Sequence, residues 1–171
     1  MKSVFKSGIP KVLTHLALLL LPVVIHADQP LPASGQFTGQ WNVTGEQQTM
    51  EFMDEREIAI TRYRGQVNIK KGDGLPRSFF TECLSFGDTG GSGEARCEWV
   101  DSADEQIFIE LTSRVVGSKG IVKGEIVGGS GKYHGIRGVF ELEAWVYSTS
   151  NEEEREVTAY TDSLRGSWTF E

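Results

Sequence analysis

Residues 128–138 read GGSGKYHGIRG and lie between two β-type segments, residues 120–127 and 139–148. Glycine adopts a positive φ at little steric cost, so the glycines of this stretch allow a sharp reversal over which Tyr133 can pack. The spacing fits neither a phosphate-binding loop, in which Ser or Thr follows the lysine, nor a dinucleotide-binding loop. The stretch therefore predicts a hairpin, and contact with a ligand is the alternative. The glycines expected to shape the hairpin are Gly128, Gly129, Gly131, Gly135 and Gly138.

Short β-type segments separated by turn residues continue through the chain on both sides of this hairpin. They lack the 3.6-residue apolar period of helices, and about nine of them at such close spacing indicate a sandwich or a barrel. The predicted segments are residues 36–44, 57–69, 78–86, 94–100, 106–112, 120–127, 139–148, 156–161 and 164–170.

Two similar motifs near the ends of the chain favour a barrel over a sandwich. FTGQW occupies residues 37–41 and GSWTF occupies residues 166–170, each with Gly two residues before Trp. If these two strands pair, the sheet closes and has no exposed edge. We therefore expect an all-β, calycin-like fold, a single closed antiparallel barrel of about eight to nine strands over residues 35–171. A chance likeness between two short motifs is the alternative.

The first residues have the pattern of a cleavable secretory signal. Three lysines precede an apolar run at residues 12–25, and Ala27 supplies a small residue before polar sequence. A transmembrane anchor is the alternative, but the run has only about 14 residues and contains Pro22, whereas a spanning helix needs ~20. We predict a signal at residues 1–27, a flexible lead-in at residues 28–34, and a secreted or periplasmic protein that is no longer at a membrane after cleavage.

Removal of the signal changes the charge and the histidine content. Three of the 17 basic residues leave, so 14 face 24 acidic ones and the net charge becomes −10. Such a surface repels nucleic acid and anionic lipid, so neither is an expected partner. Only His134 remains, which argues against a multi-histidine metal site and a Ser-His-Asp triad. Asp101, Asp104 and Glu105 could hold Ca²⁺, but so few carboxylates in a turn more often cap it. We expect no metal and no cofactor.

Cys83 and Cys97 flank a glycine-rich turn at residues 87–93. In an oxidising compartment two cysteines in a small domain are usually paired, and closing a loop of this size contributes ~3 kcal/mol to stability. We predict a disulfide between them. The alternative is a reactive free thiol, for which the neighbouring Arg96 gives little support.

The segment at residues 78–86 can present either of two faces to the interior. If the face with Phe80, Glu82, Leu84 and Phe86 points inward, burial would raise the pKa of Glu82 and make it a candidate acid–base group. The alternative, which we favour, places the face with Cys83 inside and Glu82 in solvent.

The glycine stretch resembles the GGTGKY-A-G-I-T-G signature of the allene oxide cyclase barrel-like superfamily, with Ser130, His134 and Arg137 as the differences. Residues 97–108, CEWVDSADEQIF, are similar to the cysteine, Asp-rich turn and strand that precede the signature in bacterial members, and Cys83 fits their first cysteine. The likeness covers about 60 of the 144 residues after the signal. It implies a barrel related to allene oxide cyclases and dirigent proteins, and it implies a fold more than a reaction.

Three functions are compatible with such a barrel. The first is binding of a small apolar molecule in the lumen, without catalysis. The second is a cyclase-like or dirigent-like enzyme that uses Glu82. The third is a structural or interaction module with a filled lumen, and a homo-oligomer is left open. The residues expected to line a ligand site are Phe37, Trp41, Phe80, Phe140 and Trp168.

Overall fold

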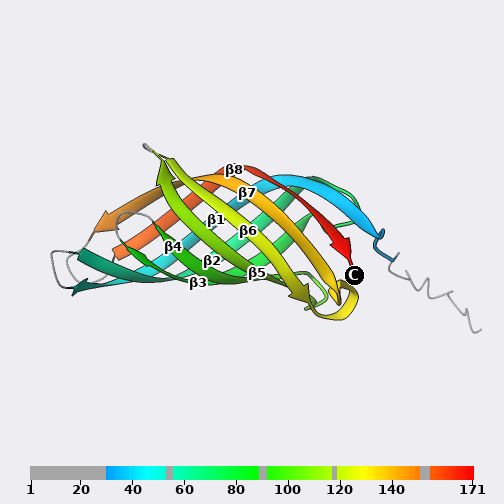
Figure 1. Ribbon diagram of the computed structural model, residues 1–171, viewed down its shortest axis with the longest axis horizontal. Coiled ribbons are helices and arrows are strands. Elements are labelled where there is room, and N and C mark those ends of the chain that lie inside the picture. The colour runs from blue at the N-terminus through cyan, green and yellow to red at the C-terminus, as the bar shows by residue number, and fades with distance from the viewer. Residues whose placement is uncertain (1–29, 53–55, 89–91, 117–118, 151–154) are drawn as a thin grey trace, which may run out of the picture.

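The structure is a computed structural model that describes residues 30–52, 56–88, 92–116, 119–150 and 155–171 (Figure 1). The predicted signal lies outside these ranges. The described strands and the single short 3-10 helix are β1 (Ser34–Phe52), β2 (Arg56–Gly72), β3 (Ser78–Asp88), β4 (Gly93–Val100), β5 (Gln106–Val116), β6 (Lys119–Gly129), η1 (Gly131–Tyr133), β7 (Ile136–Ser150) and β8 (Arg155–Phe170). In the described ranges no helix has the length and apolar character needed to cross a membrane.

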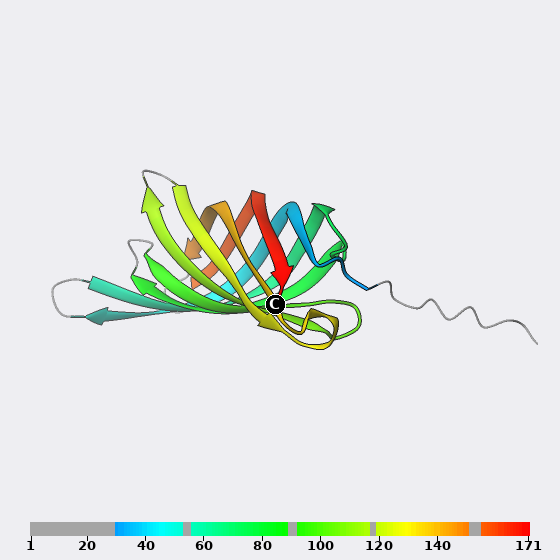
Figure 2. The ribbon, with the colours of Figure 1, turned by 45° about the vertical axis from the view of Figure 1, so that its right-hand side comes forward.

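Each strand pairs antiparallel with the next, and β1 also pairs with β8, so the sheet is a closed eight-stranded barrel (Figures 1 and 2). The expected closure by the two terminal motifs is confirmed, because Phe37 lies opposite Gly166. The last two predicted segments form one strand, β8. The pairing register between β8 and β1 shifts between Gly39 and Trp41 of β1. This irregularity explains why the alternation of inward and outward residues breaks near residue 162.

Aromatic side chains fill one half of the barrel interior. Phe37, Trp41, Phe79, Trp99 and Phe140, here called the aromatic plug, are all buried. The ring centroids of Trp99 lie 5.5 Å from Trp41 and 5.4 Å from Phe140, within the range of favourable aromatic pairs. The plug comes from the beginnings of β1, β3 and β7 and the end of β4. It therefore occupies the end of the barrel where the chain also terminates, which we call the closed end.

Two glycines make room for the plug. A Cβ atom built at Gly124 would lie 2.1 Å from the ring of Phe140, and one at Gly166 would lie 2.5 Å from the Cβ of Phe140. Strand glycines often mark such a close approach. The strongly coiled sheet and its aromatic filling therefore depend on each other.

The segment before β1 is attached to the closed end. Leu31 packs against the core, and the carbonyl of Ala33 accepts a hydrogen bond of 2.9 Å from the N–H of Phe170. Pro32 lies against Gly74 in the connection between β2 and β3. The described part of the predicted lead-in is thus part of the packed domain.

Candidate functional site

The other half of the lumen is an open cup between the plug and the barrel end opposite the closed end, which we call the mouth. Its volume is about 470 Å³. Trp41 belongs both to the plug and to the lining of the cup, so it lies where the two meet. The main apolar lining residues are Trp41, Val43, Ala59, Leu111, Val122 and Leu142. The polar ones are Gln47, Thr61, Tyr63, Ser85, Asp88, Ser92, Glu94, Ser113, Tyr160 and Thr161.

Hydrogen-bonding groups gather on the side of the cup formed by β1, β2 and β3. The Nε2 of Gln47 donates to the Oγ1 of Thr61 at 3.3 Å, and the Oγ of Ser85 donates to the carbonyl of Thr61 at 3.3 Å. Burial raises the pKa of Tyr63 above its ordinary value, although its hydrogen bond with Thr61 acts in the opposite direction. The Tyr63 phenol is therefore uncharged at neutral pH.

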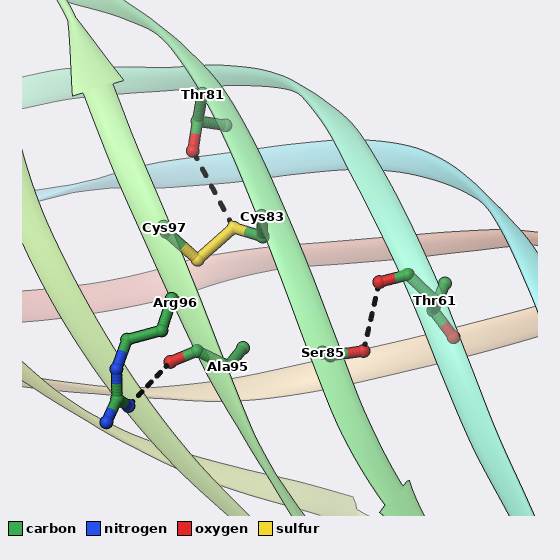
Figure 3. The surroundings of a disulfide bond; sticks show 7 residues. All are labelled: Thr61, Thr81, Cys83, Ser85, Ala95, Arg96 and Cys97. Carbon is green, nitrogen blue, oxygen red and sulfur yellow. Dashed lines mark hydrogen bonds between the residues drawn. A yellow bond between two sulfur atoms is a disulfide. The ribbon is translucent and has the colours of Figure 1, made fainter.

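The predicted disulfide is confirmed and lies in the wall of the lumen. Cys83 on β3 is directly opposite Cys97 on β4, and their sulfur atoms are 2.06 Å apart. Figure 3 shows the bond between the two strands, with Thr81 and Ser85 on the same face of β3. No free cysteine is found in the described ranges, so the reactive-thiol alternative is wrong for this pair.

The face of β3 that carries Cys83 is the inner one, as the favoured alternative predicted. The expectation that Phe80 lines the lumen is wrong, because its side chain lies on the outer surface and is 48% exposed. The outer face of β3 carries Phe80 and Phe86 and the inner face carries Phe79 and Cys83, so both faces have apolar residues and the alternating pattern could not distinguish them. A usable signal was present on the neighbouring strand, where Arg64 lies directly opposite Glu82 and Arg62 lies two residues away.

Glu82 is on this outer face and does not reach the lumen. It forms an ion pair with Arg62 and lies 3.5 Å from Arg64, with both arginines on β2. The hydrogen bond from Arg62 is the main reason why the pKa of Glu82 is lowered. A raised pKa and an acid–base role in the lumen are therefore both ruled out for Glu82, which removes the proposed enzymatic carboxyl.

The four other predicted lining residues are buried, but only one of them reaches the cup. Phe37 and Phe140 belong to the plug, and Trp168 packs against Phe170 with ring centroids 5.5 Å apart. Trp41 is the one that lines the cup. The prediction overlooked the small and hydroxyl side chains, because it ranked candidates by aromatic character. Their signal was the alternation of small residues such as Ala59 and Thr61 along inward-facing positions.

The glycine stretch forms the connection between β6 and β7 at the closed end, as predicted. Gly128, Gly131 and Gly135 have φ values of 156°, 55° and 82°. Gly129 has no positive φ; it is needed because a Cβ there would lie 2.6 Å from the Cβ of Tyr133. Gly138 likewise meets the backbone of β8, where a Cβ would lie 2.3 Å from the carbonyl of Ser167.

A cluster of polar contacts ties this hairpin to the turn between β4 and β5. The hydroxyl of Tyr133 donates to the Oδ2 of Asp101 at 2.9 Å, and the Nζ of Lys132 lies 2.5 Å from the same oxygen. Lys132 also pairs with Glu105 at 3.1 Å. We call these four residues the latch. The two segments that carry the family resemblance are therefore in direct contact.

Asp101 and Glu105, two of the three possible calcium ligands in the sequence, belong to the latch. The Oδ1 of Asp101 accepts hydrogen bonds from the N–H groups of Ala103 and Glu105, so both oxygens have partners and one of them faces an ammonium group. Across the described ranges, no three or more His, Cys, Asp or Glu side chains gather as a metal site would require. The acidic turn is thus a structural cap.

A larger but shallow hollow of about 1090 Å³ lies mainly over the outer surface. Charged side chains of both signs line it, including Lys71, Glu125 and Arg165, and it has no enclosing wall comparable to the lumen. The cup is the better candidate because side chains from all around the barrel converge on it.

Comparison of the chain with protein-family models, with curated proteins and with solved structures finds no match in any of the three.

Proposed function

We propose that this protein is an exported barrel that binds a small, largely apolar molecule in its cup without transforming it. The observation that carries the proposal is a lumen plugged at one end and hollow at the other. Its volume of about 470 Å³ is in the range of about 300–1,000 Å³ that is typical of ligand sites. The exposed surface of the lining is mainly apolar, with hydroxyl groups among the aliphatic and aromatic side chains, which is also typical of such sites. Because Glu82 faces outward, no observation favours the enzymatic alternative.

Two further parts of the proposal rest on the sequence. Export is supported by the signal pattern and by the disulfide, since disulfides persist mainly in oxidising compartments. Membership of the allene oxide cyclase barrel-like superfamily is supported by the closed barrel and by the hairpin formed by the glycine stretch. Intact mass of the protein recovered from outside the cytoplasm tests export, and a mass that still includes residues 1–27 would contradict cleavage.

Ligand binding is tested with phenylnaphthylamine, an uncharged dye of three aromatic rings that fluoresces in apolar surroundings. The wild-type protein should bind it, and Ala159→Phe should abolish the binding because Ala159 lines the cup. Thr158→Phe is the matched control, since it adds the same ring at the adjacent, outward-facing and exposed position of β8. Equal binding by the wild type and both variants would place the dye outside the cup and contradict the proposal. Independently of the dye, native mass spectrometry of protein purified from its natural source would identify any retained ligand.

A further inference from the structure

We infer that the cup selects uncharged ligands and excludes anions, an inference that rests on the proposed binding function. The carrying observation is the chemistry of the inward-facing side chains. Within the part of the lining that the structure describes, they are aliphatic, aromatic, hydroxyl, amide or disulfide groups. Tyr63 has its phenol in the wall of the cup, and burial raises its pKa, so it remains neutral. The other titratable residues of the described lining, Asp88, Glu94 and Tyr160, are at exposed positions of their strands.

Among the lining residues that the structure describes, charged groups lie only at the mouth of the cup. Asp88 and Glu94 lie at the rim. Each occupies an outward-facing position of its strand, and each side chain is exposed. Glu57 on β2 pairs with Arg155 on β8 at 3.7 Å, so these two charges offset each other. Asp88 and Glu94, the charged residues in the described lining of the cup, are both acidic, so they oppose the approach of an anion.

Desolvation makes this lining selective. A carboxylate or sulfonate that enters an apolar cavity loses its water and needs an opposite charge to replace it. The described wall offers hydroxyl and amide dipoles instead, mainly from Gln47, Thr61 and Ser85. These groups suit a hydroxyl or carbonyl on one edge of a neutral molecule, while Leu111 and Leu142 contact its apolar remainder.

A pair of dyes that differ by one charge tests the inference. Anilinonaphthalene sulfonate has the same three rings as phenylnaphthylamine and adds a sulfonate. The wild-type protein should bind phenylnaphthylamine at least about tenfold more tightly than the sulfonate at matched ionic strength, because the sulfonate loses its water without gaining a cation. Equal affinity for the two dyes in the cup, defined by loss of both in Ala159→Phe, would overturn the charge selectivity while leaving the binding function intact. Failure of both dyes to bind would instead count against the proposed function.

A gain-of-function variant gives an independent test. Gln47→Lys places an ammonium group in the cup wall and should shift the affinity ratio toward the sulfonate by about tenfold. Gln48→Lys adds the same charge at the next residue of β1, which is exposed and faces outward, and should leave the ratio unchanged. Thermal unfolding of both variants verifies that each is folded. An equal shift in the two variants would show that net charge of the molecule, and not the lining of the cup, controls selectivity.

Discussion

Asp101 is a buried carboxylate on which the latch at the closed end depends. Its side chain is 1% exposed, and it accepts hydrogen bonds from Tyr133 and from two backbone N–H groups while pairing with Lys132. Asp101→Asn keeps the shape but removes the charge, so the charge-assisted contacts are weakened. We expect the free energy of unfolding to fall by about 2 kcal/mol, measured by urea denaturation at neutral pH.

The same substitution has a pH signature. Burial alone would raise the pKa of Asp101, but the hydrogen bonds from Lys132, Ala103, Tyr133 and Glu105 outweigh it and lower the pKa. A lowered pKa stabilises the fold above the unfolded value of about 3.9, and this contribution disappears as the pH falls through the folded value. The stability gap between the wild type and Asp101→Asn should therefore be constant near neutral pH and shrink below about pH 4.

Asp104 in the same turn supplies the control for Asp101. It is exposed and has a φ of 59°, a conformation that Asn also tolerates. Asp104→Asn should change the free energy of unfolding by no more than about 0.5 kcal/mol. If Asp101→Asn and Asp104→Asn lower the free energy of unfolding equally, the contacts of Asp101 in the latch do not stabilise the fold as described.

Strand β6 offers a matched test of how glycine shapes the barrel. At Gly124 an added Cβ would lie 2.1 Å from the ring of Phe140, which is held against Trp41 and Trp99. At Gly120 the nearest atom would be the carbonyl of Ala144 at an ordinary 3.5 Å. Gly124→Ala should therefore lower the unfolding free energy by about 1–3 kcal/mol, whereas Gly120→Ala should stay within about 0.5 kcal/mol of the wild type. The pair shares one strand and one substitution, so similar losses in both would show that the Phe140 contact does not determine the effect.

The hairpin of β3 and β4 is the element that the disulfide crosslinks. The two cysteines are 14 residues apart, and their bond restricts the unfolded chain by an amount equivalent to about 3 kcal/mol in the loop-entropy model. Replacing both cysteines by Ala should lower the unfolding free energy by about that amount, measured by urea denaturation. Reduction of the denatured wild type should add the mass of two hydrogens, and no mass change would refute the bond.

The success of the sequence predictions differed among the elements for physical reasons. Strand positions, barrel closure and the 128–138 hairpin could be predicted because alternation and glycine placement are local properties. The inner face of β3 was ambiguous, since both faces carry apolar residues and only the neighbouring arginines separate them. The cup itself could not be predicted, because whether a lumen is filled depends on where side chains from eight strands meet.

At the scale of the molecule, the barrel is held closed by its last strand. Residues 165–169 pair with residues 34–38 of β1, and Trp168 is buried at the closed end. Deletion of residues 165–171 removes the five pairs between β8 and residues 34–38 of β1, and it removes that core side chain. We expect the truncated protein to lose near-ultraviolet circular dichroism and cooperative thermal unfolding.

Deletion of Glu171 alone is the control for this truncation. It removes an exposed residue whose contacts are an ion pair with Arg137 at 3.4 Å and a hydrogen bond to the carbonyl of Gly135. This variant should keep a cooperative transition. A cooperative transition in the longer deletion as well would mean that closure by β8 is dispensable.

The pairing of Ser34 with Thr169 also affects how quickly the barrel can form. The first strand pairs with the last one, so the sheet closes only after β8 has been synthesised. Pairings between residues so distant in sequence form slowly, because the entropy of a long loop is lost before any contact compensates for it. During this interval β1 has an unpaired edge that can associate with other chains. Closure of the barrel is therefore a slow step that depends on the meeting of its two strands most distant in sequence.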